Sequence, residues 1–257
     1  MWFAEIDKFP SAVLAQHYPD VPNYGDMTRI PDEAAGIDLL VGGTPCQSFS
    51  VAGLRGGMDD KRGNLALEYC RLAERFRPRW VVWENVAGVL HADEGSAFGS
   101  ILGAMVELGY CCAWRVLDAQ YFGVAQRRRR VFLVGHLGGP ATSAAAVLFE
   151  PSSMSGDSPP CREEGEDIAN TITTSSQRLD PETETLINAG GFARRIMPVE
   201  CERLQGFPDN YTAIQYRGKA ATDSPRYKAL GNSMAVPVMR WIGERIAKVD
   251  TILKAGE

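Results

Sequence analysis

The stretch IDLLVGGTPCQSFS, residues 37–50, decides the fold class. Its first five residues form an apolar run bounded by Gly36 and by Gly42 and Gly43, which is typical of a strand buried on both faces of a parallel sheet. Cys46 then follows the carboxyl end of that strand, where ligands bind in open α/β sheets. Because free cysteine usually behaves as a small buried hydrophobe, Cys46 considered alone favours a packing role.

Apolar runs typical of strands alternate with helical patterns through the first half of the chain. The expected strands are residues 2–6, 37–43, 80–85, 111–119 and 130–135, and the expected helices are residues 11–18, 65–76 and 98–110. Such alternation predicts βαβ units and an α/β fold whose sheet is largely parallel. Within residues 65–76, apolar side chains recur every three to four positions, which predicts a helix face turned to the core.

Composition narrows the class of protein. A chain of 257 residues fits one large domain, or one domain with a smaller companion. We find no unbroken apolar span and no basic start followed by an apolar stretch, so the sequence predicts a cytoplasmic protein with no membrane partner. The six cysteines show no CxxC pair or histidine-rich spacing, which argues against both a metal site and a disulfide framework.

Charge and amino-acid composition divide the sequence into three segments. Residues 1–137 carry 14 basic and 16 acidic side chains, residues 138–192 carry 2 and 9, and residues 193–257 carry 11 and 7. Within the middle segment, residues 148–178 are rich in Ser, Pro, Glu and Thr, which predicts loop or an inserted module, and helical patterning returns after residue 192. A net charge of −5 is compatible with DNA binding, since a DNA-binding surface needs only a local basic patch.

Three expected strand ends carry side chains suited to one chemical site. TPCQ (44–47) supplies a thiol, ENV (84–86) a carboxylate, and QRRRR (126–130) a cluster of guanidinium groups. Each motif taken singly is explained as well by a strand end, a turn or a solvated charge run. Their occurrence together, in this order, favours a shared site.

PCQ, ENV, QRRRR, RRIMPVECERLQGFPD (194–209) and GNSMAVPV (231–238) resemble the ordered motifs of the DNA cytosine C5-methyltransferases. Several motifs in the right order are far more specific than a single signature. The resemblance spans nearly the whole chain and implies a Rossmann-like sheet that binds S-adenosylmethionine. Residues 138–192 then correspond to a short, acidic target-recognition region, and residues 1–137 and 193–257 to the catalytic domain.

The resemblance implies a role for each catalytic group. Cys46 is the nucleophile that adds to carbon 6 of cytosine, which turns the ring into an enamine able to attack an activated methyl group. Glu84 shares a proton with ring nitrogen N3, and Arg128 and Arg130 are the functional arginines, with Arg130 nearer the base. The target base must be flipped out of double-stranded DNA to reach them.

The resemblance also implies two sets of binding residues. Glu5 binds the ribose hydroxyls of the donor, Asp26 binds its adenine amino group, and Asn232 ties the last helix to the first motif, although a turn-capping role explains Asn232 about as well. The expected donor-binding set is Glu5, Ile6, Asp26, Met27, Pro45, Leu65 and Asn232. The expected target-base set is Pro45, Gln47, Ser48, Asn85, Val86, Arg128 and Arg130.

One element of the family pattern is expected ahead of Trp2, namely a first strand with a glycine-rich turn that forms a wall of the donor site. Without it the sequence predicts an unpaired sheet edge. Three explanations stay open: an internal methionine of a longer protein, a partner chain that supplies the element to an otherwise monomeric enzyme, or a remnant that has lost activity.

The expected function is methylation of cytosine in double-stranded DNA, as in restriction-modification or in the protection of phage or bacterial DNA. A cytosine methyltransferase acting on transfer RNA and a catalytically impaired DNA-binding remnant are the alternatives. A cysteine hydrolase is disfavoured, because His17, His91 and His136 stand in no motif that would pair them with Cys46.

Overall fold

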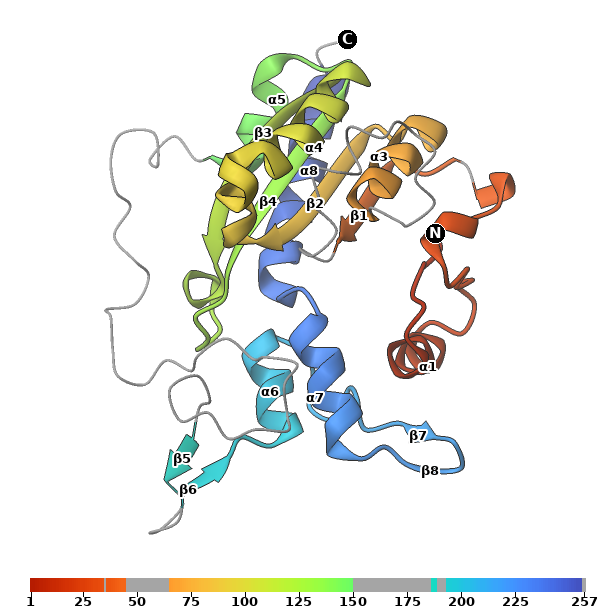
Figure 1. Ribbon diagram of the computed structural model, residues 1–257, viewed down its shortest axis with the longest axis vertical. Coiled ribbons are helices and arrows are strands. Elements are labelled where there is room, and N and C mark those ends of the chain that lie inside the picture. The colour runs from red at the N-terminus through yellow and green to blue at the C-terminus, as the bar shows by residue number, and fades with distance from the viewer. Residues whose placement is uncertain (35, 45–64, 150–185, 189–192, 256–257) are drawn as a thin grey trace. The chain divides into compact units, whose positions relative to one another are not determined.

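The computed structural model describes residues 1–34, 36–44, 65–149, 186–188 and 193–255 (Figure 1). Contacts group them into two compact units, each built from separate stretches of chain. The first unit contains Met1–Ile30, Asp118–Arg128 and the described part of Pro159–Arg240. The second contains the described parts of Pro31–Leu117 and Arg129–Ser158, together with the described part of Trp241–Glu257. The expected division at residues 138 and 193 stays a prediction.

The second unit is built on a four-stranded sheet with the order β1-β2-β4-β3. Its strands are β1 (Leu39–Gly43), β2 (Trp80–Val86), β3 (Tyr110–Asp118) and β4 (Arg129–Leu137). β1 runs parallel to β2, whereas β4 runs antiparallel to β2, so the expectation of a largely parallel sheet is wrong in its second half. Only residues 119–128 join β3 to β4, which is too short for the helical crossover that parallel neighbours need.

The core of this sheet is the central pair β2 and β4, whose apolar runs are buried. Trp83 and Leu133 are fully buried. β1 differs, because Leu39 is 38% exposed and Val41 is 41% exposed while Leu40 is buried. The prediction that this strand is buried on both faces is therefore wrong: among the described strands, β1 lies at an edge of the sheet.

Helix α3 (Leu65–Phe76) matches its expected bounds and buries the predicted stripe, with Leu65 itself half-buried. The Tyr69 hydroxyl donates to the carbonyl of Val82 at 2.9 Å and lies 3.2 Å from the carbonyl of Leu40, so it links β1 to β2. A side chain at Gly42 would meet the Tyr69 ring at 3.0 Å, which explains the glycine at this point of the strand.

Two further helices of the second unit are α4 (Ser96–Glu107) and α5 (Ala141–Leu148), and α8 (Val236–Ala255) begins in the first unit and continues into the second. α5 was not expected from the sequence, and it ends where the expected loop, residues 148–178, begins. Its last turn is capped by two guanidinium groups: Arg245 Nη2 donates to the carbonyls of Ala146 and Phe149, and Arg115 Nη1 donates to that of Leu148. Positive charge is stabilising at the carboxyl end of a helix, which is the negative end of the helix dipole, so these arginines fix the point where α5 ends.

The first unit contains α1 (Lys8–His17), α6 (Pro198–Gln205) and α7 (Asp223–Asn232). It also contains two antiparallel pairs, β5 (Leu186–Asn188) with β6 (Ala193–Arg195) and β7 (Gln215–Tyr216) with β8 (Lys219–Ala220). The strand expected at residues 2–6 is reduced to one parallel bridge between Phe3 and Asn23, so that prediction is wrong.

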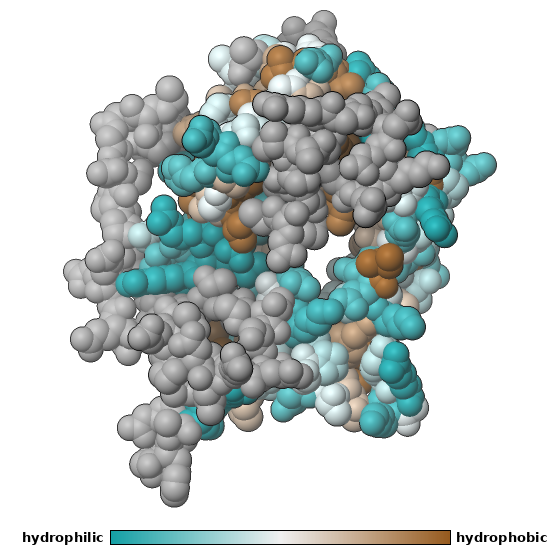
Figure 2. All heavy atoms as spheres, viewed as in Figure 1, coloured by the Kyte–Doolittle hydropathy of each residue, from teal (hydrophilic) through white to brown (hydrophobic). Residues whose placement is uncertain are grey.

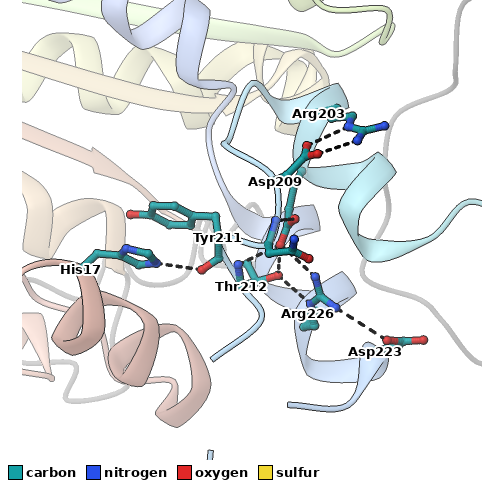
Figure 3. A network of polar contacts seen from close by, with 9 residues as sticks. His17, Arg203, Asp209, Tyr211, Thr212, Asp223 and Arg226 are labelled. Atoms are coloured by element: carbon teal, nitrogen blue, oxygen red, sulfur yellow. Dashed lines mark hydrogen bonds and ion pairs between the residues drawn. The ribbon is translucent and has the colours of Figure 1, made fainter. Parts of the chain in front are cut away.

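A buried carboxylate organises the chain after α6 (Figure 3). Glu202 is fully buried and accepts hydrogen bonds from the backbone N–H of Asn210 and Thr212, from the Thr212 hydroxyl, and from Arg226 Nη2. The carbonyl of Tyr211 accepts a hydrogen bond of 2.8 Å from His17 Nε2, which ties this segment to α1. The network fixes the backbone that follows the LQGF motif.

Figure 2 shows a largely hydrophilic face on which apolar side chains form small separate groups. Throughout the described ranges, we find no helix with both the length and the apolar character needed to cross a membrane.

Candidate active site

The carboxyl end of β2 carries the expected carboxylate, and β4 carries its partner. The antiparallel register places Val86 opposite Arg130, and Arg130 Nε lies 3.2 Å from Glu84 Oε1. Both side chains are largely buried, with 12% of Glu84 and 16% of Arg130 exposed. Burial lowers the pKa of the Arg130 guanidinium from its ordinary value, and the Glu84 charge opposes that shift. The structure thus brings two of the predicted catalytic groups into one ion pair.

Asn85, between Glu84 and the half-exposed Val86, is buried and bonds to backbone. Its side-chain N–H donates to the carbonyl of Thr44 at 2.7 Å, and its Oδ1 accepts from the N–H of Val86 at 2.8 Å. The Thr44 hydroxyl in turn accepts a hydrogen bond of 3.0 Å from Trp83 Nε1. β2 therefore fixes the backbone one residue before the PCQ motif begins.

The expected residues Pro45, Cys46, Gln47 and Ser48 lie outside the described residues, so their roles stay predictions. Three other cysteines are poor candidates for a nucleophile, because burial raises the pKa of Cys70, Cys112 and Cys201 to about 12. A thiol with such a pKa is almost entirely protonated at neutral pH, and the thiolate is the reactive form.

The QRRRR motif alternates between exposed and inward-facing side chains. Arg127 and Arg129 are exposed, whereas Arg128 is only 4% exposed. Arg128 Nη2 donates to the carbonyl of Ser233 at 2.7 Å and to that of Gly231 at 3.2 Å. The two predicted functional arginines are thus placed in different units: Arg130 beside Glu84 in the second, and Arg128 beside the GNS motif in the first.

Two segments expected to bind the donor adenosine lie side by side in the first unit. The side chain of Asn23 joins them, because its Oδ1 accepts from the N–H of Glu5 at 2.9 Å and of Gly25 at 3.1 Å, while its Nδ2 donates to the carbonyl of Glu5. Ile6, next to Glu5, is 72% exposed. No sequence pattern singled out the role of Asn23, which stands three residues before Asp26, or that of Thr44, which directly precedes Pro45.

The second donor carboxylate is held ionised. Hydrogen bonds from the backbone and hydroxyl of Thr28 keep the pKa of Asp26 below its ordinary value. Ionised Asp26 can only accept hydrogen bonds, which suits the amino group of adenine, and half-buried Glu5 suits a pair of ribose hydroxyls. The chemistry of these two carboxylates is thus the one expected for the adenosine half of the donor, and their roles stay predictions.

The other expected donor residues are spread more widely. Met27 is half-buried at the start of a 3₁₀ turn, Met27–Arg29, next to Asp26. Asn232 is exposed at the end of α7 in the same unit, whereas Leu65 begins α3 in the second unit. Among the residues that the structure describes, no group of His, Cys, Asp and Glu side chains could hold a metal ion.

Comparison with protein families finds one match, to the C-5 cytosine-specific DNA methylases, over residues 1–157 and 150–248. The DNA N-6-adenine-methyltransferase of Escherichia phage P1 is 32% identical to this chain over an alignment 445 residues long, gaps included, and the alignment covers 99% of this chain. The type II methyltransferase M1.ScrFI of Lactococcus lactis subsp. cremoris is 31% identical over 284 residues, which cover 96% of this chain. The chain spans 59% of the phage P1 protein and 71% of M1.ScrFI.

Solved structures give the same fold. The Dnmt2 methyltransferase of S. pombe matches 95% of this chain and 90% of its own with a TM-score of 0.73 at 16% identity. The Entamoeba histolytica methyltransferase EhMeth matches 95% of this chain and 88% of its own with a TM-score of 0.66 at 15% identity. At these identities the likeness concerns the fold alone, which is that of a Rossmann-like methyltransferase.

Proposed function

Because the chain belongs to the family of C-5 cytosine-specific DNA methylases, we propose that it transfers a methyl group from S-adenosylmethionine to carbon 5 of cytosine in double-stranded DNA. The role we infer is that of a modification enzyme, as in restriction-modification or in the protection of phage or bacterial DNA. The observation that carries the proposal is the ion pair between Glu84 and Arg130 at the end of β2.

In the proposed reaction, the thiolate of Cys46 forms a bond from Sγ to carbon 6 of the flipped cytosine. Glu84 shares a proton with N3, where negative charge develops, and Arg130 holds Glu84 in place and offsets that charge. Carbon 5 then takes the methyl group, and the methyl–sulfur bond of the donor breaks. Water takes the carbon 5 proton, the C5–C6 double bond re-forms, the bond from carbon 6 to Sγ breaks to release the thiolate of Cys46, and N3 returns its proton to Glu84.

We assign donor binding to the first unit. Glu5 accepts hydrogen bonds from the ribose hydroxyls, Asp26 accepts one from the adenine amino group, and Ile6 packs against the adenine ring. Asn23 holds both carboxylate segments together, so we expect the adenosine site to be largely formed before the donor arrives.

The test combines product analysis with covalent trapping. Purified protein, methyl donor and duplex DNA should yield 5-methylcytosine, detected by mass spectrometry of the digested nucleosides. Duplex DNA containing 5-fluorocytosine should form a stable adduct, because carbon 5 carries fluorine in place of the hydrogen whose loss as a proton releases the enzyme. Cys46→Ala should form none, and an adduct that persists in this variant would refute the assignment.

A second candidate product is N6-methyladenine, which is favoured by the name of the phage P1 relative. Methylation of that amino group needs no thiol addition to the ring, so it predicts full activity in Cys46→Ala. The same nucleoside analysis separates the two products, and a transfer RNA substrate assayed in parallel separates DNA from RNA.

A further inference from the structure

We propose that Arg128 is a positioning residue for the methyl donor: it fixes the backbone on both sides of Asn232 and does not touch the target base. The inference rests on the proposed use of Asn232 and Glu5 in the donor site. It separates the two arginines of the QRRRR motif, with Arg130 serving the base and Arg128 serving the donor.

The geometry that points to this role is a pair of hydrogen bonds to the residues on either side of Asn232. One guanidinium nitrogen, Nη2 of Arg128, donates to the carbonyl of Gly231 at 3.2 Å and to the carbonyl of Ser233 at 2.7 Å. These are the residues immediately before and after Asn232, which is itself exposed. Because both flanking carbonyls are held by one buried charge, the direction in which the Asn232 side chain leaves the chain is fixed as well.

Arg128 is held in place from its own side too. Its backbone N–H donates to Asp118 Oδ1 at 2.9 Å, and the neighbouring Gln126 donates from Nε2 to the carbonyl of Leu204. Arg128 and Gln126 are 4% and 0% exposed. Nη2 is occupied by the two carbonyls, and Nε and Nη1 are buried as well, so a base could reach this guanidinium only if the chain around it opened and a buried charge lost its surroundings.

The carboxyl end of α7 needs such donors, because the last carbonyls of a helix have no partner within the helix. Gln205 Nε2 and the hydroxyl of Ser233 both donate to the carbonyl of Leu230 at 2.8 Å. Gln205 therefore caps α7 without contacting either neighbour of Asn232, which makes it the matched control for a general loosening of this helix end.

Two assays distinguish donor positioning from chemistry at the base. One is the dissociation constant of S-adenosylmethionine, measured by calorimetry on the full chain. The other is the exchange of the carbon 5 hydrogen of cytosine with water, without donor, which follows thiol addition alone. Arg128→Lys keeps the charge but not the planar fork. It should weaken donor binding about tenfold, as expected for one lost charge-assisted hydrogen bond, and leave the exchange rate within about twofold.

The controls give each outcome a meaning. Arg130→Lys should abolish exchange and leave donor binding unchanged. Gln205→Met should lower the melting temperature and leave donor binding unchanged; a loss equal to that of Arg128→Lys would overturn the proposal in favour of a general capping role. Asn232→Ala removes only the presented side chain, so unchanged donor binding there would overturn it even if Arg128→Lys failed to fold. Wild-type protein that binds no donor would instead contradict the proposed function.

Discussion

Replacing the buried carboxylate of Glu202 by an amide, Glu202→Gln, tests how much of the first unit depends on the network in Figure 3. The wild-type carboxylate meets donors on both oxygens: Asn210 N–H at 2.6 Å on one, and Thr212 N–H, the Thr212 hydroxyl and Arg226 on the other. An amide has one oxygen and one NH₂ group. Whichever way it turns, its NH₂ faces a donor.

The less costly orientation leaves the oxygen toward Thr212 and Arg226 and sets the NH₂ against Asn210. The N–H of Asn210, which lies in a partly buried hydrogen bond, then loses its acceptor, at about 1 kcal/mol, the lower end of the range for such a loss. Arg226, whose side chain is 11% exposed, also loses the negative charge beside it. The total loss in the free energy of unfolding therefore approaches the lower end of the range for breaking a buried ion pair, about 3 kcal/mol. For a chain of this size that corresponds to a fall in melting temperature of about 6 to 12 °C.

The measurement is thermal unfolding followed by circular dichroism, with urea titration as a second probe. Asp209→Asn is the matched control, because it changes the same kind of group in an exposed pair, in which 48% of Asp209 and 63% of Arg203 are accessible. Exposed pairs contribute less than about 1 kcal/mol. If the two variants lower the melting temperature equally, the buried network contributes less to the free energy of unfolding than its burial implies.

Three further outcomes follow from the site and the core. Arg130→Gln should lower the rate of methyl transfer by about 100-fold or more, since Glu84 loses its charged partner; a rate within threefold of wild type would contradict the role of the pair. Glu5→Ala should weaken donor binding in calorimetry by about 10- to 100-fold, because a charged acceptor of two hydroxyls is lost, and unchanged affinity would remove Glu5 from the ribose site. His136 stacks on Trp80 with ring centroids 4.1 Å apart, and burial lowers its pKa. The unfolded state then takes up a proton first as the pH falls below about 6.5, so this contribution to stability is full above that pH and declines below it. Melting temperatures at pH 7.5 and 5.5 should differ less in His136→Gln than in wild type, and an equal difference would contradict the assignment.

The sequence correctly predicted the elements whose apolar pattern and length are compatible with only one type of secondary structure. α3 and β2 were placed within a residue, because a stripe at helical spacing and a run of buried apolar residues are each strong signals. Strand direction was not predicted correctly for β4, since an apolar run is the same in both directions. Only the length of the connection before it carried that information.

Other elements were missed because their stabilisation comes from distant groups. α5 is a short alanine-rich helix just ahead of a polar segment, and the arginines that cap it come from β3 and α8. The strand expected at residues 2–6 needed a neighbour along its length and found one bridge, to Asn23. The apolar pattern of a segment contains no information on a distant capping side chain or on a neighbouring strand.

The candidate site was predicted by motif resemblance, and the structure places two of its predicted residues next to each other. The neighbouring β2 and β4 bring Glu84 and Arg130 together. Asn85 was expected at the target base but is buried against Thr44, and its contact with the base stays a prediction. Arg128 and Arg130, the two arginines selected by motif position, are the two that turn inward, but the carbonyls that hold Arg128 could not be read from the motif.

The interleaved construction of the two units has a consequence for biosynthesis. The ion pair between Asp7 and Lys228 and the hydrogen bond from Trp80 to Asp250 each join residues that are far apart in the chain. A nascent chain that has left the ribosome as far as residue 150 therefore carries β1 to β4 but neither α7 nor α8, and neither unit can complete its core until those helices have emerged. Contacts of such long sequence separation slow folding, so we expect the newly made protein to depend on chaperones for longer than a chain of equal length built from two consecutive domains.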